Sequence, residues 1–117
     1  MDTPAKITWK YLEPKPGSIY RHLFLKGRNI SARTIYGCYA RDDEPMSPEQ
    51  IAADRGIPLE VVREAIAYCE SRPSELERDS ALEDALLDAR GINDPGFDGR
   101  LRTLTPEEKL AIIRKFS

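Results

Sequence analysis

The segment MSPEQIAADRGIPLEVVREAIAYC, residues 46–69, constrains the fold more than any other part of the chain. Ser47, followed by Pro48 and Gln50, has the capping-box pattern that begins a helix, and Gly56 favours the left-handed conformation that ends one in a sharp turn. After this turn, apolar residues recur at spacings of three and four: Val61, Val62, Ala65, Ile66 and Cys69. That spacing forms an apolar stripe on a second helix. The segment therefore predicts two short helices joined by a tight turn, as in a helix-turn-helix.

The residues before this segment predict one more helix and a β-ribbon. Ser31 is a good N-cap for a helix over 32–43, which completes a three-helix core. Residues 6–12 and 19–27 are rich in β-branched and aromatic residues and predict two antiparallel strands, separated by the Pro- and Gly-containing stretch 13–18. A two-stranded ribbon is marginal alone, so we expect it to lie on the helices or to pair with a ribbon of another subunit.

The residues after the segment predict two further helices. Residues 74–91 have Ser74 as a cap and Gly91 as a stop, and a short helix over 106–116 follows a loop at 92–102. We thus expect a mainly α (α+β) fold, with a helix-turn-helix core, an N-terminal β-ribbon and extra C-terminal helices. The predicted division is a domain over 1–91 and a linker with a C-terminal helix over 92–117.

Composition and motifs exclude several functional classes. The 117 residues suffice for one small core, and no apolar run approaches the roughly 18 residues of a membrane span. The N-terminus lacks the apolar core of a signal peptide, so a cytoplasmic protein is expected. The chain has no Gly-rich phosphate loop or nucleophile elbow, and its single histidine, His22, has no ligand-spaced partner. We therefore expect no enzyme activity, metal or cofactor. A small hydrolase is the weakest of the functional alternatives.

The net charge of −2 conceals an uneven distribution. Residues 1–41 hold eight Lys or Arg and two Asp or Glu, a net charge of +6, so the remainder carries −8. The basic first third suits an anion such as nucleic-acid phosphate, and the acidic remainder suits a different partner. The alternative is a solvated surface on which the charges are unevenly spread.

The charge that would hold DNA phosphates lies before the helix-turn-helix and not in its second helix. The candidate DNA-binding residues are Arg21, Lys26, Arg28, Asn29, Arg33 and Arg63. The first five lie on the second strand, the following turn and the next helix, where they would contact phosphates. Arg63 alone is a candidate for reading a base, because Arg pairs bidentately with guanine. The alternatives are a charged strand edge that blocks aggregation and, for Arg63, surface ion pairs with Glu60 and Glu64.

The chain also resembles a known family over roughly residues 9–85. The features that carry this resemblance are KGRNI at 26–30, MSPEQIA at 46–52 and VREAIAY at 62–68, with Trp9, Leu12-Glu13 and Pro16-Gly17-Ser18. In these stretches the chain resembles the bacterial domain of unknown function family 433. The resemblance implies a helix-turn-helix protein of the antitoxin type, which binds a PIN-like ribonuclease toxin and its own operator in double-stranded DNA.

The antitoxin interpretation suggests partner contacts outside the resemblance, in the loop at 92–102. A PIN-type nuclease holds its metal with carboxylates, and an inserted Arg would compete with that metal. Phe97, Arg100 and Arg102 are therefore candidate toxin contacts. A homodimer is expected because the ribbon needs a partner and operators are two-fold symmetric. The alternative function is a protein-interaction module that uses the helix-turn-helix shape without binding DNA.

Overall fold

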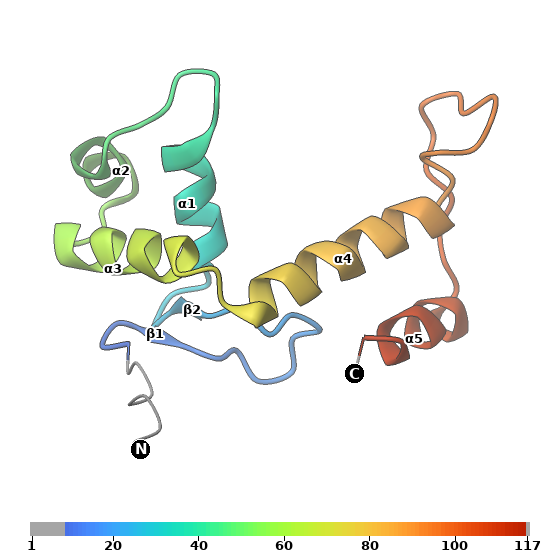
Figure 1. The fold of residues 1–117 in the computed structure, drawn as a ribbon, viewed down its shortest axis with the longest axis horizontal. Coiled ribbons are helices and arrows are strands. Elements are labelled where there is room, and N and C mark those ends of the chain that lie inside the picture. The colour runs from blue at the N-terminus through green and yellow to red at the C-terminus, as the bar shows by residue number, and fades with distance from the viewer. Residues whose placement is uncertain (1–8, 117) are drawn as a thin grey trace, which may run out of the picture. The chain divides into compact units, whose positions relative to one another are not determined.

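The computed structural model describes residues 9–116, which form five helices and two short strands (Figure 1). In chain order these are β1 (Leu12–Glu13), β2 (Phe24–Leu25), α1 (Ala32–Ala40), α2 (Pro48–Arg55), α3 (Leu59–Glu70), α4 (Ser74–Ala89) and α5 (Pro106–Arg114). The chain divides into two compact units, the first ending at Pro73 and the second beginning at Ser74. The sequence predicted a division after Gly91, which lies just after the end of α4, whereas the boundary between the two units lies before α4 begins. The mainly helical α+β class is confirmed.

The helix-turn-helix geometry follows the capping signals of the sequence. The Ser47 hydroxyl accepts a hydrogen bond from the Gln50 N–H at 3.1 Å, and the Gln50 side chain accepts one from the Ser47 N–H at 2.8 Å. Gly56 ends α2 in the left-handed region, with φ 64° and ψ 39°. Both local predictions are confirmed, because each depends on residues within one helical turn.

The apolar stripe of α3 forms the core of the first unit. It packs against α1 and α2 within the three-helix arrangement of Figure 1. The buried side chains are Ala32 and Ile35 from α1, Ile51 from α2, Ile57 from the turn, and Val61, Val62, Ala65, Ile66, Tyr68 and Cys69 from α3. Each large apolar side chain buried in this way contributes about 1.5–3 kcal/mol relative to exposure.

The strands are much shorter than the sequence predicts. The expected strand over 6–12 begins outside the described residues, and pairing is limited to Leu12 with Leu25 and Glu13 with Phe24. The prediction of antiparallel pairing is confirmed, but the predicted strand lengths are wrong. Pro14 cannot donate to a ladder, so pairing stops after Glu13.

The second edge of β2 pairs with the segment that leads into α1. The Leu25 N–H donates to Ile30 O at 2.9 Å, and Phe24 forms an antiparallel bridge with Ser31. Residues 26–29 are therefore the tip of a hairpin, and Ser31 at its end caps α1 as predicted. Leu12 and Leu25 are both buried, so the ribbon lies on the helices of its own chain.

Helix α1 ends three residues earlier than the predicted 32–43. Arg41 is already extended, with φ −71° and ψ 151°, and its Nε donates to Glu44 O at 2.9 Å. Glu44 has a positive φ of 49°, and the Met46 N–H donates to Cys38 O at 3.0 Å. The acidic residues after Ala40 therefore form a turn that closes back on the helix end.

In the second unit, α4 ends in a Schellman motif and packs against α5. The Ile92 N–H donates to Leu87 O and the Gly91 N–H donates to Asp88 O, while Gly91 has φ 94°. This is the stop predicted at Gly91. Thr105 caps α5 in a capping box with Glu108, where the helix predicted over 106–116 begins.

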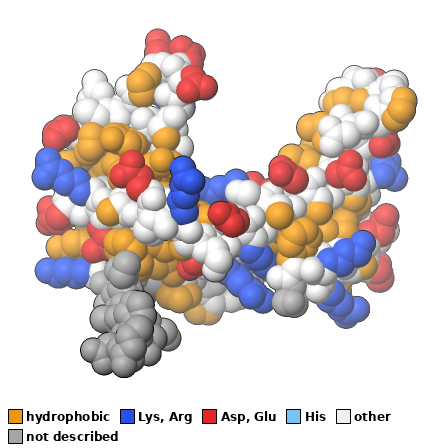
Figure 2. Space-filling model, in the orientation of Figure 1, with side chains coloured by type: hydrophobic (Ala, Val, Ile, Leu, Met, Phe, Trp, Pro, Cys, Tyr) orange, Lys and Arg blue, Asp and Glu red, His pale blue; other side chains and the backbone are white. Residues whose placement is uncertain are grey.

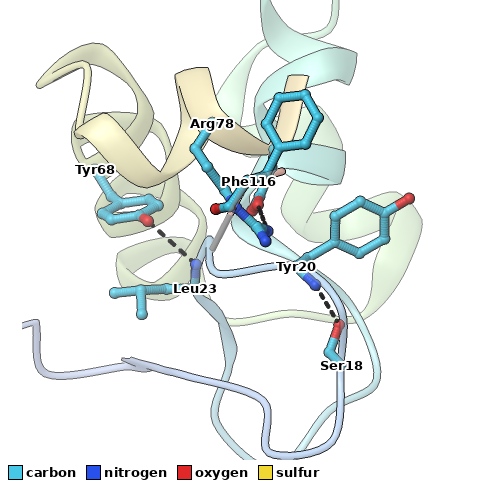
Figure 3. Close-up of polar contacts among 7 residues, drawn as sticks. Ser18, Tyr20, Leu23, Tyr68, Arg78 and Phe116 are labelled. Atoms are coloured by element: carbon cyan, nitrogen blue, oxygen red, sulfur yellow. Dashed lines mark hydrogen bonds and ion pairs between the residues drawn. The ribbon is translucent and has the colours of Figure 1, made fainter. Parts of the chain in front are cut away.

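Arg78 on α4 forms an ion pair with its neighbour Asp79 and a contact with the end of the second unit. The Arg78 Nη1 lies 2.7 Å from the Asp79 carboxylate, which is fully buried. The Arg78 Nε donates to the backbone oxygen of Phe116 at 3.1 Å (Figure 3). Arg78, in the second turn of α4, thus contacts Phe116, which follows α5.

Candidate nucleic-acid interface

The hairpin tip at residues 26–29 brings three of the predicted DNA-binding residues together. Lys26, Arg28 and Asn29 are exposed, and Gly27 has the positive φ of 71° that the turn requires. The Arg28 N–H closes the turn on Leu25 O at 3.2 Å. Within residues 9–116, the charged groups of Lys26 and Arg28 have no hydrogen-bond partner. The tip therefore presents two cations to solvent.

Lys15 lies beside this tip, although the sequence does not single it out as a DNA-binding residue. Its ammonium donates to the Asn29 side-chain oxygen and lies 4.9 Å from the centre of the Phe24 ring. An open depression of about 300 Å³ is lined by Glu13, Pro14, Lys15, Pro16, Phe24, Gly27, Arg28 and Asn29. The signal in the sequence is a lysine between two prolines, which points to a chain break and gives no indication of a long-range contact.

Three rings lie in a row along the segment before the tip, one pair tilted and the other stacked. His22 lies between Tyr20 and Phe24, with ring centroids 5.2 Å and 5.4 Å apart. The backbone N–H of Tyr20 donates to the Ser18 hydroxyl at 3.1 Å (Figure 3). His22 is only 3 % exposed, whereas Arg21 is exposed. The segment over 19–27, which was predicted as one strand, thus contains a row of three rings and an exposed Arg21, and only its residues Phe24 and Leu25 belong to the ladder.

Arg33 lies on the first turn of α1 and is half-buried. It is not part of the exposed hairpin tip. Its charge acts on the buried Cys69 thiol of α3. Burial raises the pKa of Cys69 to about 12, and the positive charge of Arg33 opposes this rise. The thiol is therefore neutral at physiological pH, as expected of a small buried apolar side chain.

Arg63, the predicted base-reading residue, forms an ion pair with α2. Its Nη2 lies 3.1 Å from the Glu49 carboxylate, and the two side chains are 62 % and 60 % exposed. The predicted alternative of a surface ion pair is thus realised with Glu49 and not with Glu60 or Glu64. Figure 2 shows positive and negative side chains interspersed on the face drawn, without one extended patch of a single sign.

The sequence suggested that Glu64 is a solvent-facing neighbour of Arg63. The structure shows a different position. Glu64 is half-buried, and its carboxylate accepts hydrogen bonds from the backbone N–H groups of Lys10 at 3.1 Å and Tyr11 at 2.5 Å. Trp9 packs edge-on against the Tyr68 ring, with centroids 5.4 Å apart. Residues 9–11 are thereby held on α3, and this part of the helix is covered by the same chain.

The predicted partner-binding residues lie in the loop between α4 and α5. Arg102 and Arg90 exchange hydrogen bonds, from the Arg102 N–H to Arg90 O at 2.9 Å and from the Arg90 Nε to Arg102 O at 2.7 Å. The Arg102 guanidinium also donates to Ala89 O, a carbonyl at the end of α4 that has no partner within the helix. Arg102 therefore holds the loop closed, while Phe97 and Arg100 are exposed on it.

The three predicted contacts nevertheless share one surface. Phe97, Arg100 and Arg102 line an open depression of about 270 Å³, together with Arg90, Gly91, Asp94, Pro95, Gly96 and Asp98. Its charged side chains are of both signs. The loop thus presents an exposed ring and an exposed guanidinium with acidic groups nearby.

Comparisons with protein-family models, with curated proteins and with solved structures found no match to this chain. Among the described residues, no group of three His, Cys, Asp or Glu side chains is placed to hold a metal ion. No helix in residues 9–116 is both long and apolar enough to cross a membrane.

Proposed function

We propose that this protein is a DNA-binding regulator of the antitoxin type. In this proposal it binds its own operator in double-stranded DNA and a partner toxin of the PIN-like ribonuclease class. The observation that carries the DNA part is the exposed hairpin tip, where the charged groups of Lys26 and Arg28 have no partner within the described residues. Cations on a ribbon next to a helix-turn-helix contact phosphates and fix the position of the protein on the duplex.

In the proposed complex, phosphate binding and base reading are divided between two elements. Arg21 and the hairpin tip contact phosphates, and Arg33 does so from the start of α1. Arg63 reads a base after leaving Glu49, which costs little because an exposed ion pair contributes only about 0.2–1 kcal/mol. This division accounts for a recognition helix that carries few positive charges.

The toxin contact is assigned to the loop after α4. Phe97 and Arg100 are among its exposed side chains, and Arg102, also exposed, supports their position through its bonds to Ala89 and Arg90. A homodimer belongs to the proposal because two-fold operators match two-fold proteins. The ribbon no longer supplies a reason for dimerisation, since its apolar face is covered by its own chain.

Binding of the full-length protein to duplex DNA tests the first part. The probe is a fluorescent duplex from the region upstream of the gene, and anisotropy is measured over a series of salt concentrations. Arg28→Glu should weaken binding to this duplex and to a scrambled duplex alike, and should lower the slope of log K against log salt by about 0.9 for each phosphate that the variant no longer binds. Lys115→Glu, in the second unit, is the control. Absence of binding by the wild-type protein would refute the DNA function.

Co-expression with the adjacent open reading frame tests the second part. Recovery of a complex that disappears on Phe97→Ala or Arg100→Ala supports the assigned contact. A complex that survives both substitutions removes the loop from the interface. Failure to recover any complex argues against a dedicated toxin partner.

A second candidate function is a protein-interaction module that does not bind DNA. The specific observation in its favour is the exposed surface of α3, where Arg63 is already paired with Glu49 and Glu60 adds a negative charge. A complex with the neighbouring gene product, together with no affinity for either duplex, would favour this function.

A further inference from the structure

We propose that the depression between the hairpin tip and the Pro14–Pro16 stretch is a phosphate-binding site, with Lys15 as its principal ligand. This inference rests on the proposed function, in which the phosphate belongs to the DNA backbone. It adds Lys15 and a defined depression to a surface for which the sequence predicted only a cluster of basic residues.

The donors of this site come from two separate segments that the fold brings together. Lys15 lies after β1, whereas Arg28 and Asn29 lie on the tip after β2, and all three line the same depression of about 300 Å³. Asn29 uses its side-chain oxygen to accept from Lys15. Its amide hydrogens, two further hydrogens of the Lys15 ammonium and the Arg28 guanidinium remain as donors.

These donors suit an oxyanion better than another ligand. The depression is walled by Phe24, over whose ring the Lys15 ammonium already lies at 4.9 Å. This cation therefore already lies against the wall of the depression. An ammonium, a guanidinium and an amide provide only N–H donors once the amide oxygen is engaged, so they match the oxygens of a phosphate and repel a metal cation.

Among the described residues, Glu13 is the one acidic side chain that lines the depression. Within residues 9–116 it forms no ion pair with Lys15 or Arg28. Its charge opposes that of a bound phosphate, so it lowers the affinity of the site. This predicts opposite effects for removing Glu13 and for removing either cation.

The test compares neutral substitutions in the full-length protein. Lys15→Gln and Arg28→Gln should each lower the slope of log K against log salt by about 0.9, equally for the upstream and the scrambled duplex. Glu13→Gln should tighten binding to both duplexes. Lys115→Gln, an exposed lysine of the second unit, is the matched control and should leave the slope unchanged. Thermal melts verify that each variant is folded.

If Lys15→Gln and Arg28→Gln change the slope no more than Lys115→Gln does, the phosphate site is refuted while the DNA function stands. If the wild-type protein binds neither duplex, the proposed function fails and inorganic pyrophosphate becomes the probe. Shifts of the Asn29 side-chain amide resonances in the wild type, absent in Lys15→Gln, then support a site for free phosphate groups. Absence of these shifts in the wild type overturns the site as well.

Discussion

The hydroxyl of Tyr68 on α3 accepts a hydrogen bond from the backbone N–H of Leu23 at 3.1 Å (Figure 3). The two residues are 45 positions apart in the chain, and the ring of Tyr68 is buried. This bond connects the backbone just before β2 to the helical core. It therefore ties the segment that leads to the hairpin tip to α3, on which Arg63 also lies.

Removal of this hydroxyl should destabilise the first unit. Tyr68→Phe keeps the ring and its edge contact with Trp9 but leaves the Leu23 N–H without this acceptor, which costs about 1–3 kcal/mol. Urea denaturation followed by circular dichroism measures the decrease. Tyr39→Phe is the control, because its hydroxyl has no hydrogen-bond partner within the described residues. Equal stability of the two variants would contradict the assigned role.

Two glycines should respond in opposite directions to the same substitution. Gly56→Ala places a side chain at φ 64°, which costs about 1–2 kcal/mol, and nothing lies within 4 Å of the added Cβ to complicate the effect. Gly37 lies in the middle of α1, where an added Cβ also meets no atom within 4 Å. Gly37→Ala should therefore stabilise by about 0.5–1 kcal/mol. Denaturation midpoints measured side by side test the pair, and destabilisation by both would show that the space around Gly37 is not open.

Cys69 should make the protein less stable at alkaline pH. Its pKa in the folded state is raised to about 12 by burial, above the ordinary value of 9.0, so the folded state retains a proton that the unfolded state releases. The stability that this difference contributes is fully present below pH 9.0 and is lost as the pH rises towards about 12. Stability measured against pH should fall less steeply above this lower limit in Cys69→Ala than in the wild type.

The reactivity of the two cysteines gives an independent measurement of the same burial. Cys69 is buried, whereas Cys38 is half-buried. A thiol reagent should therefore modify Cys38 first, and Cys69 only as the protein unfolds. Simultaneous modification of both under native conditions would contradict the buried position of Cys69.

Arg102 and Arg100 should differ in what they do, although both were predicted to contact a partner. Arg102→Ala removes the donor to Ala89 O at the end of α4, so the loop should become more sensitive to a protease that cleaves after Phe97. Arg100→Ala should leave this sensitivity unchanged, because Arg100 bonds to the Asp98 side chain through its backbone N–H, which the substitution retains. Rates of limited proteolysis measure the difference. Similar rates in both variants would show that Arg102 does not hold the loop.

The local features of this chain were determined by the sequence. The capping box at Ser47, the left-handed turn at Gly56, the cap at Ser31 and the helix stop at Gly91 all appear as predicted. Each depends on backbone groups within about one helical turn, where residue type and spacing suffice to decide the geometry. The apolar stripe of α3 was equally predictable, because the helical period decides which residues face the core.

Contacts between distant residues were decided only by the tertiary structure. Glu64 is an acceptor for the Lys10 and Tyr11 N–H groups, Lys15 meets Asn29, and Arg63 pairs with Glu49. A charged residue in the sequence shows no such partner, since its long side chain can point to solvent or to any segment that the fold brings near. The strands are short for one local and one tertiary reason. Pro14 ends the pairing after Glu13, which follows from the sequence. The Leu23 N–H donates to the Tyr68 hydroxyl on α3, which only packing places there.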